Sequence, residues 1–407
     1  MIALPMATAS LPLDVSPAIA PVTIEELRLA VPPRASTTTR VLHVINGEHY
    51  AGAERVQDLL ALRLPRLGFN VGFACLKPGE FARVRQSHKS PVHALPMRHR
   101  FDLWQAQKLA KIVRRDGYAL VHTHTARSAL VGSLAAAMAG VPMVHHVHSP
   151  TLADTTHRLR NRINAIVERR CLARAAALIT VSQSIADYVE TQGLGNVPVR
   201  VVPNGVRMRG PLVQRDTPRD RWVLGAVALF RPRKGVEVLL ESMASLVAQD
   251  YDIRLRAVGA FETPEYESQI KRLADELGLR DRITWRGFQR NVDGELTEMD
   301  LFVLPSLFGE GMPMVVLEAM ATGVPVVASR VEGVEELIGK NSCGVIVEPG
   351  DSKSLVDGLR SILDEQADWR TLRHAAHRRQ VEQFSDLVMA KSIAAIYREV
   401  LNEKAGR

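Results

Sequence analysis

Short β-branched runs alternate with amphipathic stretches from residue 40 onward, and this alternation constrains the fold more than any other feature. Apolar runs of this length, separated by helices, are typical of parallel βαβ units whose strands are buried on both faces. The helices expected in the first half include Ala53–Leu64, Ser128–Ala139 and His157–Ala173. The strands expected there are Val41–Asn46, Phe69–Leu76, Ala119–Thr123, Val141–Val147, Ala177–Val181 and Val199–Val202.

The pattern breaks at Pro203-Asn204-Gly205, and a polar stretch, Gln214–Arg221, predicts a linker before the alternation restarts. A helix is expected from Lys234 to about Gln249, and two or three more from Ser352 onward. The strands expected in this half are Trp222–Leu229, Ile253–Val258, Ile283–Arg286, Leu301–Leu304, Pro325–Ala328 and Gly344–Val347.

The predicted fold class is therefore α/β, with two Rossmann-like doubly wound domains facing a central cleft. Such domains bind ligands at the carboxyl ends of their strands, most often nucleotides, but the fold alone does not choose a reaction. We expect residues 1–39 to be a disordered extension, since they are small, Pro-rich and without a period. The expected domains are 40–208 and 209–385, and the expected C-terminal helix, 386–407, packs back on the first of them.

Charge and cysteine content narrow the class of protein only slightly. The 407 residues carry a formal net charge of +8, which permits a membrane surface, nucleic acid or a phosphorylated ligand. Aromatic residues make up only 5% and no known nucleic-acid module is visible, so nucleic acid is disfavoured. Three distant cysteines favour a reducing compartment, and no apolar run is long enough for a spanning helix. We expect a cytoplasmic protein, or one peripheral at the inner face of a membrane.

The strongest local signal is the segment from Ser306 to Met320, SLFGEGMPMVVLEAM, which reads as strand end, glycine-rich loop and helix. Pro313 suits a first helical turn, and the free N–H groups expected in the loop and at the helix start favour an anionic or hydroxyl-rich ligand. Glu310 precedes the helix and Glu318 lies in its second turn, so both can face one cleft. Glu318 lies within an apolar run, where an unpaired carboxylate would be costly.

Glu310 and Glu318, with seven residues between them, resemble the E-x7-E signature of retaining glycosyltransferases of family 4. The resemblance runs from about Arg40 to Tyr397, and it is the order and spacing of several motifs that make it specific. It implies the GT-B fold, and a bacterial enzyme that moves a sugar from a nucleoside-diphosphate sugar to a saccharide or lipid-linked acceptor in surface polysaccharide assembly. The other matching motifs are Ala51-Gly52-Ala53-Glu54-Arg55-Val56, His148, Val202-Pro203-Asn204-Gly205-Val206, Arg231 with Lys234, and Gly323-Val324-Pro325-Val326-Val327-Ala328.

The resemblance also implies roles for individual residues. Glu318 would hold the ribose hydroxyls, Glu310 the transferred sugar, and Arg231 and Lys234 the leaving diphosphate. The implied catalytic residues are His148, Glu310, Arg231 and Lys234. The implied donor-binding residues are Gly52, Arg231, Lys234, Phe288, Glu310, Gly311, Met312, Pro313, Met314 and Glu318, and the implied acceptor-side residues are His124, Glu54 and Arg55.

These assignments have a physical basis in the residues themselves. A carboxylate that accepts two hydroxyl groups recognises a diol strongly, and cations at a strand end offset charge that grows on a departing phosphate. Ala51 stands where the family usually has glycine, although Gly52 still lets the backbone approach a ligand. Arg233 matches no family position and is expected to be solvent-facing or salt-bridged.

Metal chemistry is not expected, and the family implies no obligatory metal and no other cofactor. His-x-His spacing occurs at His122 and His124 and again at His146 and His148, but no cysteine or carboxylate cluster accompanies either pair. His122, His145 and His146 are expected to be core or hydrogen-bonded residues. Asp250-Tyr251-Asp252 matches the DxD pattern of metal-dependent transferases, but it precedes a strand and is read as a polar loop.

The stretch Arg158–Arg174 carries six arginines against one glutamate, interleaved with apolar residues. It is read first as a helix with a solvated basic face, and second as a contact for anionic lipid headgroups or a pyrophosphate-linked acceptor. Arg98 and Arg100 would add to that surface.

Two other classes of protein remain as alternatives. A nucleotide-dependent epimerase or oxidoreductase is disfavoured because neither GxGxxG nor Tyr-x-x-x-Lys occurs. A non-catalytic two-domain binding protein is disfavoured because such proteins are exported and the first forty residues lack the features of a secretory signal.

Overall fold

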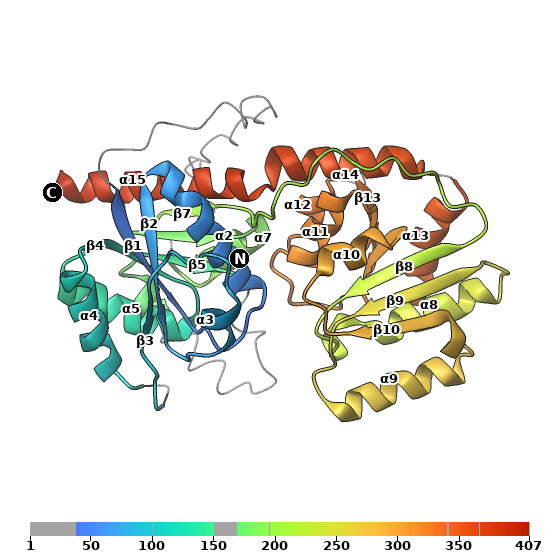
Figure 1. Cartoon of the computed structure of the whole chain (residues 1–407), viewed down its shortest axis with the longest axis horizontal. Coiled ribbons are helices and arrows are strands. Elements are labelled where there is room, and N and C mark those ends of the chain that lie inside the picture. The colour runs from blue at the N-terminus through green and yellow to red at the C-terminus, as the bar shows by residue number, and fades with distance from the viewer. Residues whose placement is uncertain are drawn as a thin grey trace, which may run out of the picture.

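The computed structural model describes residues 38–99, 101–149, 169–194, 196–339, 342–365 and 367–406. Two α/β halves lie side by side and are joined along one edge by the last two helices (Figure 1). Arg100, most of the predicted N-terminal extension and most of the Arg158–Arg174 stretch lie outside the described residues.

The first half is a parallel sheet of seven strands in the order β3-β2-β1-β4-β5-β6-β7. The central strands are covered on both faces, so β5 is buried at every position even though it includes His145 and His146. The strands are β1 (Thr39–Ile45), β2 (Phe69–Cys75), β3 (Val92–Ala94), β4 (Tyr118–Thr123), β5 (Met143–Val147), β6 (Ala177–Thr180) and β7 (Val199–Val201). The helices bounded here are α2 (Gly52–Arg63), α3 (Glu80–Val84), α4 (Trp104–Arg115), α5 (Ala126–Ala139) and α7 (Gln183–Thr191).

The second half repeats this plan with six parallel strands in the order β10-β9-β8-β11-β12-β13. The strands are β8 (Trp222–Val227), β9 (Ile253–Val258), β10 (Ile283–Gly287), β11 (Leu301–Leu304), β12 (Val326–Ser329) and β13 (Gly344–Val347). The helices are α8 (Val236–Val247), α9 (Pro264–Glu276), α10 (Val292–Thr297), α11 (Met314–Thr322), α12 (Val334–Ile338), α13 (Ser352–Leu363) and α14 (Trp369–Gln383). The predicted α/β class with two doubly wound domains is confirmed.

One predicted helix begins later than the sequence suggested. The helix expected from Lys234 begins at Val236, after a 3-10 turn over Pro232–Lys234. Gly235 separates the two with φ of 62°, and a Cβ atom there would lie 2.0 Å from the carbonyl oxygen of Pro305. Only glycine permits this approach, which brings the turn before α8 against the end of β11.

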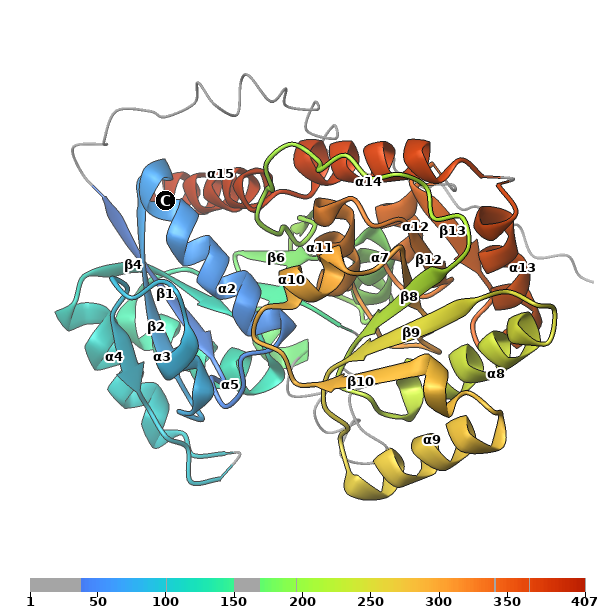
Figure 2. The same cartoon turned by 45° about the vertical axis from the view of Figure 1, so that its right-hand side comes forward.

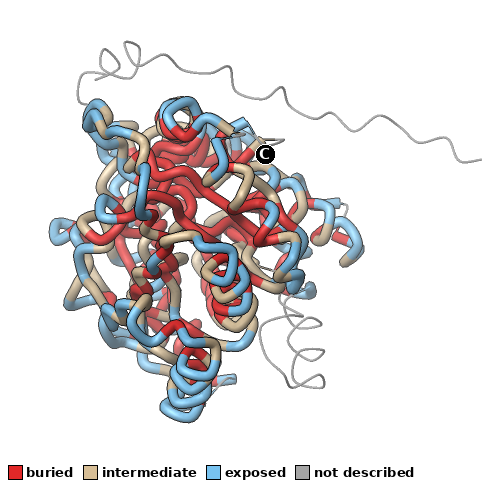
Figure 3. The backbone as a smooth tube through the Cα atoms, turned by 90° about the vertical axis from the view of Figure 1, so that its right-hand side faces the viewer, coloured by how far each residue is buried: buried red, intermediate tan, exposed pale blue. Residues whose placement is uncertain are grey.

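The chain returns to the first half at its C-terminus. Helix α14 packs on α11, and α15 (Asp386–Ala405) then packs on α2, as Figures 1 and 2 show. Asp386 accepts a 2.7 Å hydrogen bond from Arg63 of α2. Buried residues follow the strands at the centre of the molecule (Figure 3). Among the described helices, none has the length and apolar character needed to cross a bilayer.

Candidate active site

Several of the candidate residues lie at the points where strand order reverses in each sheet. In the second half this point lies between β8 and β11, and in the first half between β1 and β4. Loops that leave neighbouring strands in opposite directions open a crevice there. Arg231 and Lys234 follow β8, Glu310 follows β11, Gly52 follows β1, and His124 follows β4.

Lys234 and Glu310 form a largely buried ion pair at the second switch point. Lys234 Nζ lies 2.5 Å from Glu310 Oε1, which also accepts a 2.6 Å hydrogen bond from the Ser306 hydroxyl. Burial raises the pKa of Glu310, but Lys234 and Ser306 outweigh burial and hold this pKa below its ordinary value. Burial also lowers the pKa of Lys234.

The two arginines beside this pair have different contacts. Arg233 donates hydrogen bonds to the carbonyl oxygens of Phe308 (3.2 Å) and Gly309 (2.7 Å), so it holds the glycine-rich loop. It lies 3.8 Å from Glu310 Oε1, so the expected salt-bridged position is the one found. Arg231 lies 3.5 Å from Glu262, while its buried Nε has no hydrogen-bond partner among the described residues.

The glycine-rich loop meets the other half of the molecule at Gly311. Gly311 has φ of 83°, and a Cβ atom added there would lie 2.1 Å from the carbonyl oxygen of His148. The expectation that the loop offers free amides needs correction at two positions. Glu332, in the loop after β12, accepts hydrogen bonds from the backbone N–H groups of Gly309 (3.0 Å) and Glu310 (3.3 Å).

Glu318 is buried in α11 and reaches across the interface between the halves. Its Oε1 pairs with Arg55 of α2, while its Oε2 is buried and has no hydrogen-bond partner within the described chain. The structure therefore places Arg55, assigned by resemblance to the acceptor side, against the residue assigned to the donor ribose. One oxygen of Glu318 remains available to accept a hydroxyl.

The remaining residues assigned to donor binding differ in their contacts and in how far their side chains are exposed. An added Cβ at Gly52 would lie 3.7 Å from Met314 Cγ, so the loop after β1 faces the start of α11. Asn204 donates through its side chain to the carbonyl oxygen of Met312 (3.1 Å). Pro313 is the residue just before α11, and Phe288 is 74% exposed beyond β10.

Glu54 lies in the first turn of α2, beside the Gly52 loop, where burial raises its pKa against the lowering effect of nearby backbone amides. The structure thus places Glu54 and Gly52 together.

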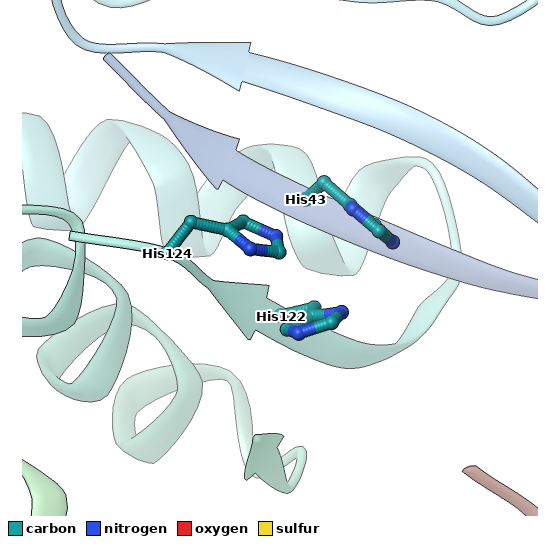
Figure 4. A group of neighbouring side chains, drawn as sticks. All are labelled: His43, His122 and His124. Atoms are coloured by element: carbon teal, nitrogen blue, oxygen red, sulfur yellow. The ribbon is translucent and has the colours of Figure 1, made fainter. Parts of the chain in front are cut away.

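Histidines gather on one face of the first sheet. His43 hydrogen-bonds to Gln57 through Nδ1 (2.8 Å) and to Tyr397 through Nε2 (3.0 Å). Figure 4 shows His43 of β1 beside His122 and His124 of the neighbouring strand and its end. His124 Nδ1 lies 3.3 Å from His148 Nε2. Burial lowers the pKa of His148 far below its ordinary range, so its ring is neutral at neutral pH.

Sequence reasoning missed Glu332, His43 and Gln57 as neighbours of the site. Glu332 follows β12, the strand paired with β11, so its place at the end of a neighbouring strand could have suggested it. His43 lies opposite His122 in the register of β1 and β4, and nothing in the spacing along the chain reveals that register.

Two family models match the chain. Residues 50–209 match "Glycosyltransferase Family 4", and residues 213–380 match "Glycosyl transferases group 1". The chain is a glycosyltransferase of the family 4 type. Its two matched segments correspond to the two halves of the fold, and Glu318 of the E-x7-E pair lies where these halves meet, since it pairs with Arg55 of the first half.

Curated relatives of this family 4 enzyme align along most of its length. An Escherichia coli UDP-Gal:alpha-D-GlcNAc-diphosphoundecaprenol alpha-1,3-galactosyltransferase is 24% identical, over 80% of this chain and 88% of the relative. The Staphylococcus aureus capsular polysaccharide biosynthesis glycosyltransferase CapM is 23% identical, over 80% and 89%.

A solved structure of Anabaena HepE in complex with UDP superposes with a TM-score of 0.76 at 20% identity, covering 89% of this chain and all of that one. It supports the two-domain GT-B fold.

Proposed function

We propose that this glycosyltransferase moves a sugar from a nucleoside-diphosphate sugar to a saccharide or lipid-linked acceptor in bacterial surface polysaccharide assembly, with retention at the anomeric carbon. The observation that carries the proposal is the group at the second switch point. There the Lys234–Glu310 pair, the Arg231 guanidinium and Oε2 of Glu318, which has no partner among the described residues, lie around the ends of β8 and β11.

The role proposed for each of these residues follows from its charge. Lys234 and Arg231 supply positive charge where a leaving diphosphate gains negative charge, and in a buried site this interaction is stronger than in water. Since Glu332 already occupies the amides of Gly309 and Glu310, the diphosphate depends on these cations rather than on those two N–H groups. Glu310 accepts hydroxyl groups of the transferred sugar, and Glu318 accepts a ribose hydroxyl.

The first half supplies the acceptor side of the reaction. His148 and His124 line the crevice opposite the glycine-rich loop, and their neutral rings can accept or donate a hydrogen bond to an attacking hydroxyl. The donor base is proposed to be uracil, because the E. coli relative is named for UDP-galactose and HepE was solved with UDP. No metal is assigned to the transfer step.

A panel of UDP-, GDP- and ADP-sugars tests the proposal. Thermal stabilisation by one nucleotide and slow hydrolysis of its sugar would identify the donor, and NMR of the released anomer would report retention. Stabilisation by NAD(P) with redox turnover, or ligand binding without any turnover, would instead support the epimerase or the binding protein.

We also propose a peripheral contact with an anionic membrane surface through α4. Phe101, Leu103 and Trp104 are 51%, 46% and 69% exposed at its start. Trp104, Lys108, Lys111 and Arg115 follow at helical spacing along its exposed side. An exposed aromatic residue that precedes a basic stripe is typical of helices that lie at a lipid interface. Such a contact would bring the acceptor half to a lipid-linked acceptor.

A further inference from the structure

The histidine cluster follows from strand register. His43 of β1 is opposite His122 of β4, and His122 is opposite Val144 of β5. Side chains two apart along a strand share a face, so His124, His146 and His148 continue on the same side of the sheet. His145 points to the opposite side, where its Nδ1 lies 2.7 Å from the Thr123 hydroxyl.

The hydrogen bonds of this cluster are unequally distributed. His43 uses both ring nitrogens, and His122 Nδ1 lies 2.6 Å from the Tyr397 hydroxyl. Neither ring nitrogen of His146, which is 0% exposed, has a partner among the residues described, and the same is true of Nε2 of His124 and of His122. Buried polar atoms without partners are costly and rare, and an ion or a water commonly satisfies them.

The geometry of His124, His146 and His148 suits a metal ion. One ring nitrogen from each lies within 4.8 Å of the other two. Two nitrogens bound to tetrahedral zinc at 2.0–2.1 Å are about 3.3 Å apart, and His124 Nδ1 and His148 Nε2 are 3.3 Å apart. The His146 ring stacks on His148 at 4.3 Å. Turning the His146 ring about its Cβ–Cγ bond to complete the site would break no hydrogen bond of that ring. His148 Nε2 would exchange its contacts with His124 Nδ1 (3.3 Å) and Gln57 Nε2 (3.4 Å) for the metal.

We propose that His124, His146 and His148 form a site for a divalent transition metal such as Zn²⁺. Three imidazoles without a thiolate or carboxylate favour zinc, copper or nickel over magnesium or calcium. A second group, His43, His122 and His124, is also compact, but both ring nitrogens of His43 are already hydrogen-bonded, at 2.8 Å to Gln57 and 3.0 Å to Tyr397, so one of these two bonds would have to break. His148 is only partly buried, so the ion reaches the site from the crevice.

Bound metal would regulate the enzyme rather than serve its reaction. His148 Nε2 would be coordinated and unable to contact donor or acceptor, so zinc inhibits transfer. This consequence rests on the proposed function, whereas metal binding itself does not. The proposed site therefore adds a metal ion, which was not expected from the sequence.

Direct binding is the primary test. Tag-free protein treated with a chelator is titrated with zinc chloride by calorimetry, and with Co²⁺ while visible absorption is recorded. We expect one ion per chain and the intense bands of tetrahedral Co²⁺. His146→Asn should weaken zinc affinity at least about tenfold, since even indirect supporting residues contribute that much. His145→Asn, a buried neighbour on the opposite face, is the matched control and should bind as wild type does.

Anomalous scattering at the zinc edge from wild-type crystals keeps the test independent of how the variants fold. A peak bonded to His124, His146 and His148 supports the site. A peak elsewhere, no saturable binding, or wild-type affinity in His146→Asn overturns it. If zinc binds here but no donor sugar is turned over, the metal site is supported and the proposed reaction is wrong. If transfer occurs but zinc does not bind, the proposed reaction is supported and the metal site is wrong.

Discussion

Arg55 in the first half forms an ion pair with Glu318 in the second, across 263 residues of sequence. Arg55 is 31% exposed at its side chain and Glu318 is 5% exposed, so the carboxylate depends on this partner more than the guanidinium does. The pair joins α2 to α11 at the crevice. It also ties the carboxylate assigned to the ribose to the position of the first half.

Arg55→Met should lower the free energy of unfolding by about 3 kcal/mol, because it leaves a buried carboxylate without a counter-charge. The double variant Arg55→Met/Glu318→Gln should recover most of this loss. Urea unfolding measures both, with exposed Arg66→Met as the control on the same half. An additive double variant would mean that the two residues do not interact.

The Lys234–Glu310 pair separates stability from catalysis. Lys234→Met should cost about 3 kcal/mol of stability, since the buried Glu310 then keeps only the hydrogen bond from Ser306 and the more distant Arg233. Lys234→Met/Glu310→Gln should restore stability but not transfer, which should stay at least about 100-fold below wild type because the cation at the leaving group and the carboxylate proposed to bind the sugar are both absent. Recovery of activity along with stability would show that Lys234 is only a structural partner.

The same pair predicts a change in pH dependence. In the wild type the folded pKa of Glu310 is lowered, so its contribution to stability is present above its unfolded pKa and is lost as pH falls. In Lys234→Met the effect of burial on Glu310 prevails and raises its folded pKa. The contribution of Glu310 to stability is then present at low pH and is lost as pH rises. The deficit of Lys234→Met should therefore grow between pH 5 and pH 7.5, at up to about 1.4 kcal/mol per pH unit. Urea unfolding at both values tests it, and Glu310→Gln in the same background should abolish the trend.

Gly311 tests the contact between the glycine-rich loop and His148. Gly311→Ala adds a Cβ that would lie 2.1 Å from the His148 carbonyl oxygen, so the loop must move. We expect kcat/KM to fall by about 100-fold, the effect of misplacing reacting groups by roughly an ångström. Gly278→Ala is the matched control, because Gly278 has φ of 68° and nothing within 4 Å of its added Cβ. Equal activity of the two variants would leave only backbone strain as the explanation.

The sequence predicted the strands well because burial on both faces forces continuous β-branched runs, and β9, β11 and β13 have the predicted bounds. No helix or strand was expected over residues 80–116, where the edge strand β3 has three residues and α4 exposes a basic side. Such elements lack the doubly buried pattern on which the prediction depended.

The site residues that follow strand ends could be predicted from the sequence, whereas the contacts between strands and between the two halves could not. Lys234 and Glu310 belong to local motifs, whereas Arg55–Glu318 and His43–His122 arise from the docking of two halves and from strand register. The separation of these residues along the chain carries no information about either contact. Glu332 shows the same limit, since its hydrogen bonds to the glycine-rich loop depend on how two loops pack.

Binding to lipid vesicles tests the α4 surface. Lys108→Glu reverses one charge of the basic stripe, a change of two units, and each unit near an anionic surface contributes about 1 kcal/mol. Binding to phosphatidylserine vesicles should weaken by about 2 kcal/mol, roughly thirtyfold, and wild-type binding should decline as salt screens the charges. Lys353→Glu, on the exposed side of α13 in the other half, carries the same charge change and should bind as wild type does. Trp104→Ser should weaken binding at all salt concentrations, because the contribution of Trp104 is apolar. Equal binding by Lys108→Glu and Lys353→Glu would mean that the membrane contact lies elsewhere on the protein.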